Sequence, residues 1–176
     1  MRVVAVDSVS ISIRGGEVLL IMGPSGSGKT TLLSMMGCIL HPTKGKVIVD
    51  GRIVNDLSED LLPDIRKRYF GFVFQAFNLF PSLKAVENVA VVLRLKGWDK
   101  SKIREEALGL MERVGLGKRS YFYPKDLSGG EKQRVAFARA LAANPPIILA
   151  DEPTANLDSR TGREVLELLK RLAEDS

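Results

Sequence analysis

A glycine-rich loop near the N-terminus carries the clearest chemistry in this sequence. Residues 23–30 are Gly-Pro-Ser-Gly-Ser-Gly-Lys-Thr, between an apolar run at 18–22 and a helix-like run at 31–40. Backbone N–H groups can wrap closely around a triphosphate only where no Cβ intervenes, which explains the glycines. The helix that follows directs its first N–H groups and its dipole at the same anion. The spacing therefore predicts a phosphate-binding loop.

The last residues of this loop have separate expected roles. Lys29 would reach the β- and γ-phosphates, and the Thr30 hydroxyl would ligate Mg²⁺. The alternative is a Gly/Ser-rich turn before a helix that binds no nucleotide, but the flanking strand-like and helix-like runs favour the nucleotide site. The residues expected to bind the nucleotide are Gly23, Pro24, Ser25, Gly26, Ser27, Gly28, Lys29, Thr30 and Thr31.

Two adjacent carboxylates form a second candidate. Asp151 and Glu152 directly follow the apolar run 147–150. A buried strand that ends in acids places them at the edge where open α/β sheets bind ligands. Since successive side chains on a strand point opposite ways, we expect different roles: Asp151 on Mg²⁺ and Glu152 polarising the attacking water. Such a strand end is by itself also a common surface turn, and the phosphate-binding loop is what favours the catalytic interpretation.

A third motif is Leu-Ser-Gly-Gly-Glu at 127–131. Ser128 can cap the following helix, while Gly129 and Gly130 leave its first N–H groups uncovered. The result is a second anion-binding helix start, which is unneeded if one loop already holds the phosphates. A helix cap with spare glycines is the alternative reading.

Together these motifs resemble the ABC-type ATPases. The loop at 23–30, Gln75, the run 127–131, the acids at 151–152 and Asn156-Leu157-Asp158 occur in that family's order over nearly the whole chain. The resemblance implies that two copies pair head to tail and sandwich ATP between the loop of one and the helix start of the other. It implies that Gln75 contacts Mg²⁺ or the attacking water and that Asp158 lies across the dimer seam. The residues expected to contact nucleotide from the second copy are Ser128, Gly129, Gly130 and Glu131.

The resemblance also implies a role in transport. Residues 71–81 and 150–158 are most similar to transporters of the lipoprotein-release and macrolide-efflux type, and 71–81 also resembles polar amino-acid importers. We expect an ATP-hydrolysing subunit, cytoplasmic and peripheral on the inner face of the cell membrane, that powers transmembrane permease subunits. Phe77, Leu79 and Phe80 then either form an exposed apolar patch for those subunits or pack inside the helical insertion. The alternatives are an ABC-type ATPase of DNA repair or the ribosome, and a switch that binds ATP without hydrolysis.

Composition fits an ordinary globular domain. The 176 residues are 45% hydrophobic and 27% charged, with a net charge of +5 and one cysteine. No apolar run reaches the roughly 18 residues of a membrane span. Basic residues are scattered among acids rather than gathered in a block, so no nucleic-acid partner is expected. Cys38 excludes an internal disulfide and is expected to be a small buried thiol.

The elements that must position these motifs indicate an α/β fold. We expect a P-loop NTPase with a mostly parallel sheet core, a small antiparallel β subdomain and a helical insertion. Strands are expected at 3–13, 18–22, 72–74 and 147–150, and a hairpin around Asp50-Gly51. Helices are expected from Ser58 toward Arg68, at 83–96, from Ser101 to Val114, after the run 127–130 as far as Ala143, and after Asp158 or Ser159.

We expect one domain over residues 1–176. Its parts would be a β subdomain and phosphate-loop core at 1–80, a helical subdomain at 81–144, and the acidic strand with the following helix at 145–176. Two family features are missing: an aromatic residue ahead of the phosphate loop, and a histidine beyond the last helix, since the single His41 is expected in a solvated loop. We therefore expect a C-terminal remainder to be missing, with a strand that would join the core sheet. On that view, the 176 residues alone turn over ATP poorly.

Overall fold

A computed structural model describes residues 4–155 and 157–174, and the chain forms two compact units that divide between Arg66 and Lys67. Helix α2 (Leu62–Tyr69) runs across this division. The boundaries expected at 80 and 144 concern subdomains and stay predictions. Among the described residues, no helix combines the length and the apolar character that a bilayer crossing requires.

The N-terminal unit contains helix α1 (Lys29–Met36) and the hairpin of β1 (Ile48–Val49) and β2 (Arg52–Ile53). The hairpin expected around Asp50-Gly51 is confirmed, with Ile48 opposite Ile53. Both turn residues adopt positive φ, 50° for Asp50 and 73° for Gly51, as a two-residue hairpin loop requires. Helix α2 begins at Leu62, four residues later than the expected start at Ser58.

Two expected strands are not formed in this unit. Neither the described part of 3–13 nor 18–22 is assigned as a strand, and Leu20 is 72% exposed. A strand requires a neighbouring strand for its ladder, and a parallel strand requires cover on both faces. Within residues 4–66 the only assigned strands are those of the short hairpin, which pair with each other. The prediction was therefore wrong for these two segments.

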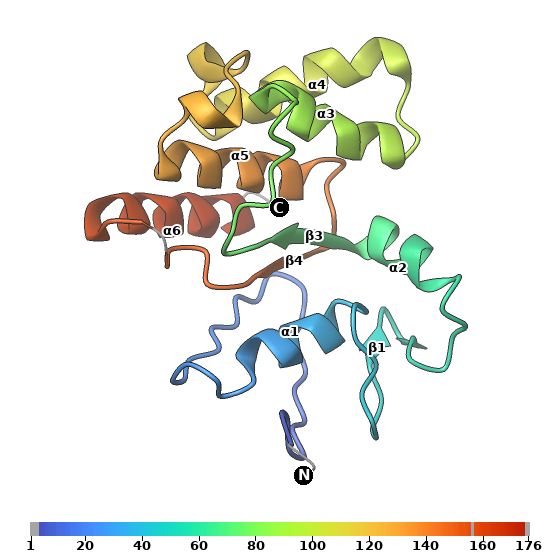
Figure 1. Cartoon of the computed structure of the whole chain (residues 1–176). Coiled ribbons are helices and arrows are strands. Elements are labelled where there is room, and N and C mark those ends of the chain that lie inside the picture. The colour runs from blue at the N-terminus through green and yellow to red at the C-terminus, as the bar shows by residue number, and fades with distance from the viewer. Residues whose placement is uncertain (1–3, 156, 175–176) are drawn as a thin grey trace. The chain divides into compact units, whose positions relative to one another are not determined.

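The C-terminal unit is built around one central helix, α5 (Gly129–Leu141). In Figure 1, α5 lies between the pair α3 (Ala85–Leu95) and α4 (Lys100–Arg113) on one side and α6 (Ser159–Glu174) on the other. Two 3-10 helices, Gly117–Arg119 and Pro124–Asp126, connect α4 to α5. The four expected helices are confirmed with small shifts. Helix α4 is capped by the Asp99 carboxylate rather than by Ser101, because Asp99 accepts from the Ser101 N–H.

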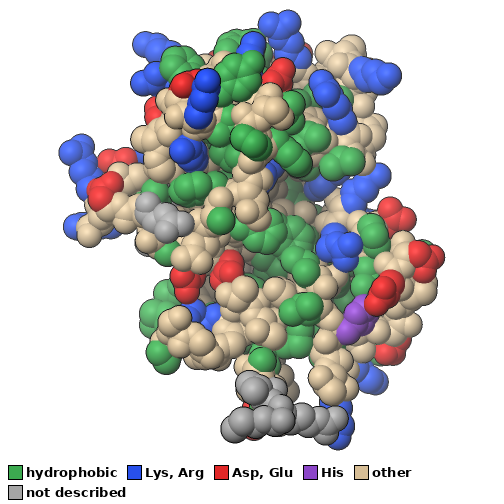
Figure 2. Space-filling view, viewed as in Figure 1, with side chains coloured by type: hydrophobic (Ala, Val, Ile, Leu, Met, Phe, Trp, Pro, Cys, Tyr) green, Lys and Arg blue, Asp and Glu red, His purple; other side chains and the backbone are tan. Residues whose placement is uncertain are grey.

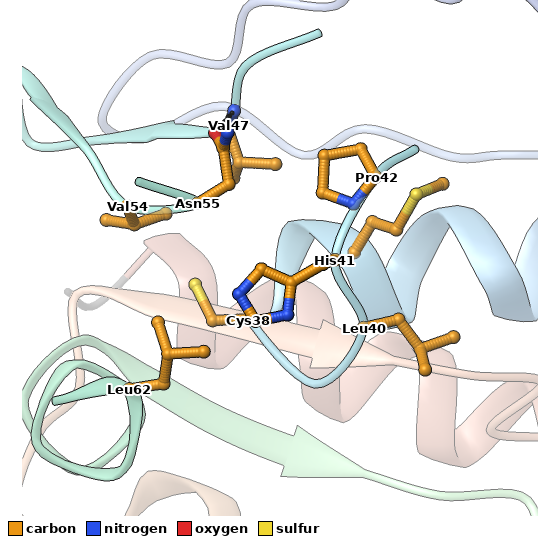
Figure 3. Close-up of a pocket in the computed structure, with 9 residues that line it drawn as sticks. Cys38, Leu40, His41, Pro42, Val47, Val54, Asn55 and Leu62 are labelled. Atoms are coloured by element: carbon orange, nitrogen blue, oxygen red, sulfur yellow. Dashed lines mark hydrogen bonds between the residues drawn. The ribbon is translucent and has the colours of Figure 1, made fainter. Parts of the chain in front are cut away.

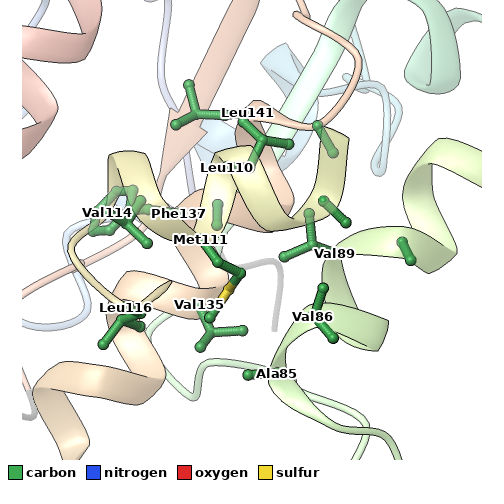
Figure 4. Close-up of a cluster of buried hydrophobic side chains, with 14 of the residues drawn as sticks. Ala85, Val86, Val89, Leu110, Met111, Val114, Leu116, Val135, Phe137 and Leu141 are labelled. Carbon is green, nitrogen blue, oxygen red and sulfur yellow. The ribbon is translucent and has the colours of Figure 1, made fainter. Parts of the chain in front are cut away.

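The core of this unit fills the space between α3, α4 and α5. Figure 4 shows Val89, Met111, Val135 and Phe137 converging there, and each is at most 1% exposed. Alanines at 136, 138 and 140 on α5 are also buried, which lets the neighbouring helices approach closely. The core thus holds α5, and with it Ser128, in one position within this unit.

A short parallel sheet flanks α5. Strand β3 (Phe70–Val73) pairs with β4 (Ile147–Ala150), with Phe70 opposite Ile147 and Val73 opposite Ala150. β3 starts two residues before the expected strand, and β4 matches its expected bounds. The Asp151 N–H donates to the Val73 carbonyl at 2.9 Å, which continues the ladder beyond the strand end. This pairing sets the edge at which the candidate catalytic residues lie.

Candidate nucleotide and catalytic site

The phosphate-binding loop leads directly into α1. Gly28 is the N-cap of this helix at φ 89°, a left-handed conformation that suits glycine. A side chain there would also collide with the Ala5 carbonyl oxygen. Gly23 faces Ser27 closely enough that a Cβ would lie 2.8 Å from the Ser27 Oγ. Gly28 is therefore needed by the loop's own geometry as well as by any ligand, whereas at Gly23 a side chain would require the Ser27 hydroxyl to move.

Lys29 closes over its own loop. Its ammonium donates to the carbonyls of Gly23 at 2.9 Å and Pro24 at 3.0 Å. Thr30 is exposed and Thr31 half-buried, both in the first turn of α1, where helix N–H groups lack intrahelical partners. The structure therefore brings the lysine, the first-turn threonines and the glycine loop together, as expected for a phosphate cradle.

Gln75, Asp151 and Glu152 gather at one edge of the parallel sheet. Gln75 follows β3 by two residues, and the acids directly follow β4. Because the strands are parallel and in register, their carboxyl ends meet at the same edge. Gln75 and Glu152 are exposed there, and Asp151 is half-buried. Glu152 has φ 42°, a sparsely populated conformation for a non-glycine residue of the kind that clusters at functional sites.

The start of α5 is a capping box. The Ser128 Oγ accepts from the Glu131 N–H at 3.2 Å, and the Glu131 carboxylate accepts from the Ser128 N–H at 2.8 Å. The hydrogen bond from Ser128 is the main cause that lowers the pKa of Glu131, and Arg119 lowers it further. Gly129 is half-buried, whereas Gly130 is buried against Thr161 of α6. The cap explains Ser128 and Glu131 locally and leaves Gly129 uncovered.

Asp158 has a local structural role as well. Its carboxylate accepts from the N–H groups of Arg160 and Thr161, both at 3.1 Å, so it caps α6. Hydrogen bonds from Thr161 are the largest cause that lowers the pKa of Asp158. The expected cap at this end of the chain is confirmed. Asn156 lies outside the described residues.

Sequence reasoning missed how the segment after Gln75 is held. Arg139 of α5, only 9% exposed, donates through its two terminal nitrogens to the carbonyls of Phe77 and Asn78. Burial lowers the pKa of Arg139. Asn88 of α3 is fully buried; its Oδ1 accepts from the Phe80 N–H, and its amide donates to the Phe80, Leu83 and Lys84 carbonyls. The only sequence signal was a charged residue between alanines 138 and 140.

The apolar residues of this segment divide between the two expectations. Leu79 packs against the helical core, and Phe77 is half-buried. Phe80 is 49% exposed. Packing inside the unit therefore accounts for Leu79, and Phe80 alone among the three remains clearly available at the surface.

The pocket in the N-terminal unit is small and apolar. Figure 3 shows Cys38, Leu40, Pro42 and Val54 around it, with Leu62 of α2 on another side. Cys38 is buried, as expected, and burial raises the pKa of its thiol. His41 also lines the pocket yet is exposed, which confirms the solvated loop position. Arg66 donates to the Cys38 carbonyl at 2.7 Å and so ties α2 to the end of α1.

These features agree with one family of proteins. A sequence model of the ABC transporter family matches residues 6–155, which include the phosphate-binding loop, Gln75, the capping box of α5 and both acids. The chain belongs to the ABC transporter family. It is an ATP-binding domain of that family with the P-loop NTPase fold, as predicted.

Individual ABC proteins are similar over nearly the whole chain. An uncharacterized ABC transporter ATP-binding protein of Thermotoga maritima is 49% identical over 99% of the chain and 74% of its own length. The macrolide export ATP-binding/permease protein MacB of Burkholderia pseudomallei is 46% identical over 97% of the chain and 26% of its own length. The ABC cassette MJ0796, solved as a dimer in a post-hydrolysis state with ADP and Pi, superposes with a TM-score of 0.88 at 48% identity, covering 97% of this chain and 75% of that one.

Proposed function

We propose that this chain hydrolyses ATP in a head-to-tail dimer and thereby drives transmembrane permease subunits. The observation that carries the proposal is the register of β3 and β4, because it brings Gln75, Asp151 and Glu152 to one sheet edge. The dimeric MJ0796 cassette with ADP and Pi supports the assembly and the reaction. The similarity to the macrolide export protein MacB supports a role in transport.

The residues divide the work as follows. Lys29 exchanges its hydrogen bonds to the Gly23 and Pro24 carbonyls for the β- and γ-phosphates. Glu152 holds the attacking water and accepts its proton, and Gln75 orients that water. Ser128 and Gly129 of the second copy contact the γ-phosphate at the start of α5, and Asp158 lies near the dimer seam.

Mg²⁺ fits the donor chemistry of this site. The Thr30 hydroxyl, the Asp151 carboxylate and the Gln75 amide oxygen are hard oxygen ligands, which Mg²⁺ prefers. When bound, the ion would neutralise charge on the phosphates. Phosphate oxygens and water would supply the remaining ligands, as is usual for Mg²⁺.

We further propose a cytoplasmic location, peripheral on the inner face of the cell membrane, with Phe80 in the contact to a permease subunit. The alternative role on nucleic acid would favour a concentrated basic surface. On the face shown in Figure 2, basic side chains are spread among acidic and neutral ones. Within the same function class, the alternative to an exporter is an importer of polar amino acids.

The decisive variant is Glu152→Gln. We expect ATP turnover to fall at least about 100-fold, as loss of a general base implies, while ATP accumulates in a stable dimer. Glu105→Gln, an exposed acid on α4, is the matched control and should behave as wild type. Phosphate release and analytical ultracentrifugation with ATP measure the two effects. Normal turnover in Glu152→Gln would refute the assignment of the base.

A further inference from the structure

The start of α5 carries a negative charge where the proposed function brings in another. Glu131 lies in the first turn of this helix and stays ionised, since its pKa is lowered. A carboxylate near a helix N-terminus stabilises the helix through the dipole. An incoming triphosphate would compete with that carboxylate for the same partial positive charge. The charge of Glu131 must therefore be compensated for the helix start to accept phosphate.

Arg119 is placed to supply this compensation. Its Nε lies 3.2 Å from the Glu131 Oε1, while the Glu131 Oε2 accepts from the Ser128 N–H. The two carboxylate oxygens thus have separate partners: one closes the helix cap, and the other meets a guanidinium. The Glu131 side chain is only 25% exposed, whereas Arg119 is 48% exposed. The pair would lose water on dimer closure, which strengthens its electrostatic effect.

The position of Arg119 is set before any ligand arrives. Its backbone lies in the 3-10 helix Gly117–Arg119, with its N–H donating to the Leu116 carbonyl at 2.8 Å. Its guanidinium stacks over the Phe122 ring, with the carbon 4.6 Å from the ring centroid. Little side-chain entropy is left to lose when the nucleotide binds.

We propose that Arg119 is a positioning residue for the nucleotide, acting through Glu131: it neutralises that carboxylate so that the start of α5 accepts the triphosphate held by a second copy. The inference rests on the proposed function, because it requires that Ser128 meets phosphate across the dimer. It adds a charge pair between the loop before α5 and the helix cap. No contact between Arg119 and the nucleotide is needed.

The test measures the ATP concentration that gives half-maximal dimer, using Glu152→Gln as the hydrolysis-blocked parent. Arg119→Ala should raise this concentration about 3- to 30-fold, the effect of an uncompensated charge at a helix terminus. Arg119→Ala with Glu131→Gln should return within about twofold of the parent, because glutamine still accepts from the Ser128 N–H without the charge. The Arg119→Ala defect should also shrink as salt rises, since salt screens exposed charges.

Controls separate this inference from the function on which it rests. Lys118→Ala removes an exposed neighbouring charge and should leave the dimer unchanged. Ser128→Ala should weaken the dimer. If it does not, both the proposed function and the inference about Arg119 are refuted. If Ser128→Ala weakens the dimer while Arg119→Ala matches Lys118→Ala, only the Arg119 inference is overturned. A double variant as weak as Arg119→Ala would overturn it too, since the role would then be structural. Circular dichroism confirms that each variant is folded.

Discussion

Replacing Arg139 by methionine should destabilise the C-terminal unit by about 2 kcal/mol. Arg139 donates to the Phe77 and Asn78 carbonyls, and hydrogen bonds that involve a charged group contribute about 1.5–3 kcal/mol each. The desolvation cost of burying the guanidinium offsets part of this stabilisation. Methionine avoids that cost and fills a similar volume, so the net loss is smaller than the sum of the two hydrogen bonds. Urea unfolding with a slope of about 2 kcal/mol/M should show the midpoint about 1 M lower. Proteolysis at 77–80 should become faster than in wild type.

The control and the conservative variant make this prediction specific. Arg113→Met removes an exposed arginine from the last turn of α4 and should change the free energy of unfolding by less than about 0.5 kcal/mol. Arg139→Lys keeps the charge but has one nitrogen to reach two carbonyls, so it should lie between wild type and methionine. Equal midpoints for Arg139→Met and Arg113→Met, with unchanged proteolysis, would show that the two carbonyl contacts do not hold the segment.

Three further predictions concern close packing and a helix cap. Gly71→Ala should lower the free energy of unfolding by about 1–3 kcal/mol, because its Cβ would overlap a backbone carbonyl of α5. Gly109→Ala has open space around it in α4 and should raise the free energy of unfolding by about 0.4–1 kcal/mol. Urea unfolding in which both variants change stability in the same direction would contradict this. Gly130→Ala should lower the melting temperature because its Cβ would overlap the Thr161 methyl, and Thr161→Ser should restore most of the loss; no rescue would mean that another contact is responsible. Asp158 has a lowered pKa when folded, so its contribution to stability is present above the unfolded-state pKa of about 4 and is lost as the pH falls through the folded-state pKa. Asp158→Asn should therefore lower thermal stability at pH 7, and its difference from wild type should shrink as the pH falls below about 4; a constant difference in circular dichroism melts over that range would contradict this.

Local signals were sufficient for the elements whose contacts are local. The Asp50-Gly51 hairpin and the capped start of α5 depend on residues within a few positions, and they were predicted. Strand 147–150 was also predicted from its apolar run, although its partner β3 lies far away in the sequence. The segment 18–22 was predicted as a strand from its apolar run, yet a strand also needs a partner that no local pattern supplies.

The candidate site shows the same division. The motif residues were identified by type and spacing, and the sheet register explains why Gln75 lies near the two acids. The tether by Arg139 joins residues 62 positions apart and so left almost no trace in the sequence. The pairing of Arg119 with Glu131 was equally hidden, because it joins a 3-10 turn to the following helix. Such tertiary contacts, rather than the motifs, determine how the motif residues are held.

The turn after Gln75 has its shape imposed from outside. Phe77 and Asn78 adopt φ values of 61° and 48°, and a phenylalanine gains nothing from this left-handed backbone. The conformation of the turn is therefore determined by Arg139 in α5, which lies far along the chain. Residues 76–80 grafted onto an unrelated scaffold would keep their sequence but lose this backbone conformation. A graft that also included α5 with Arg139 would keep both.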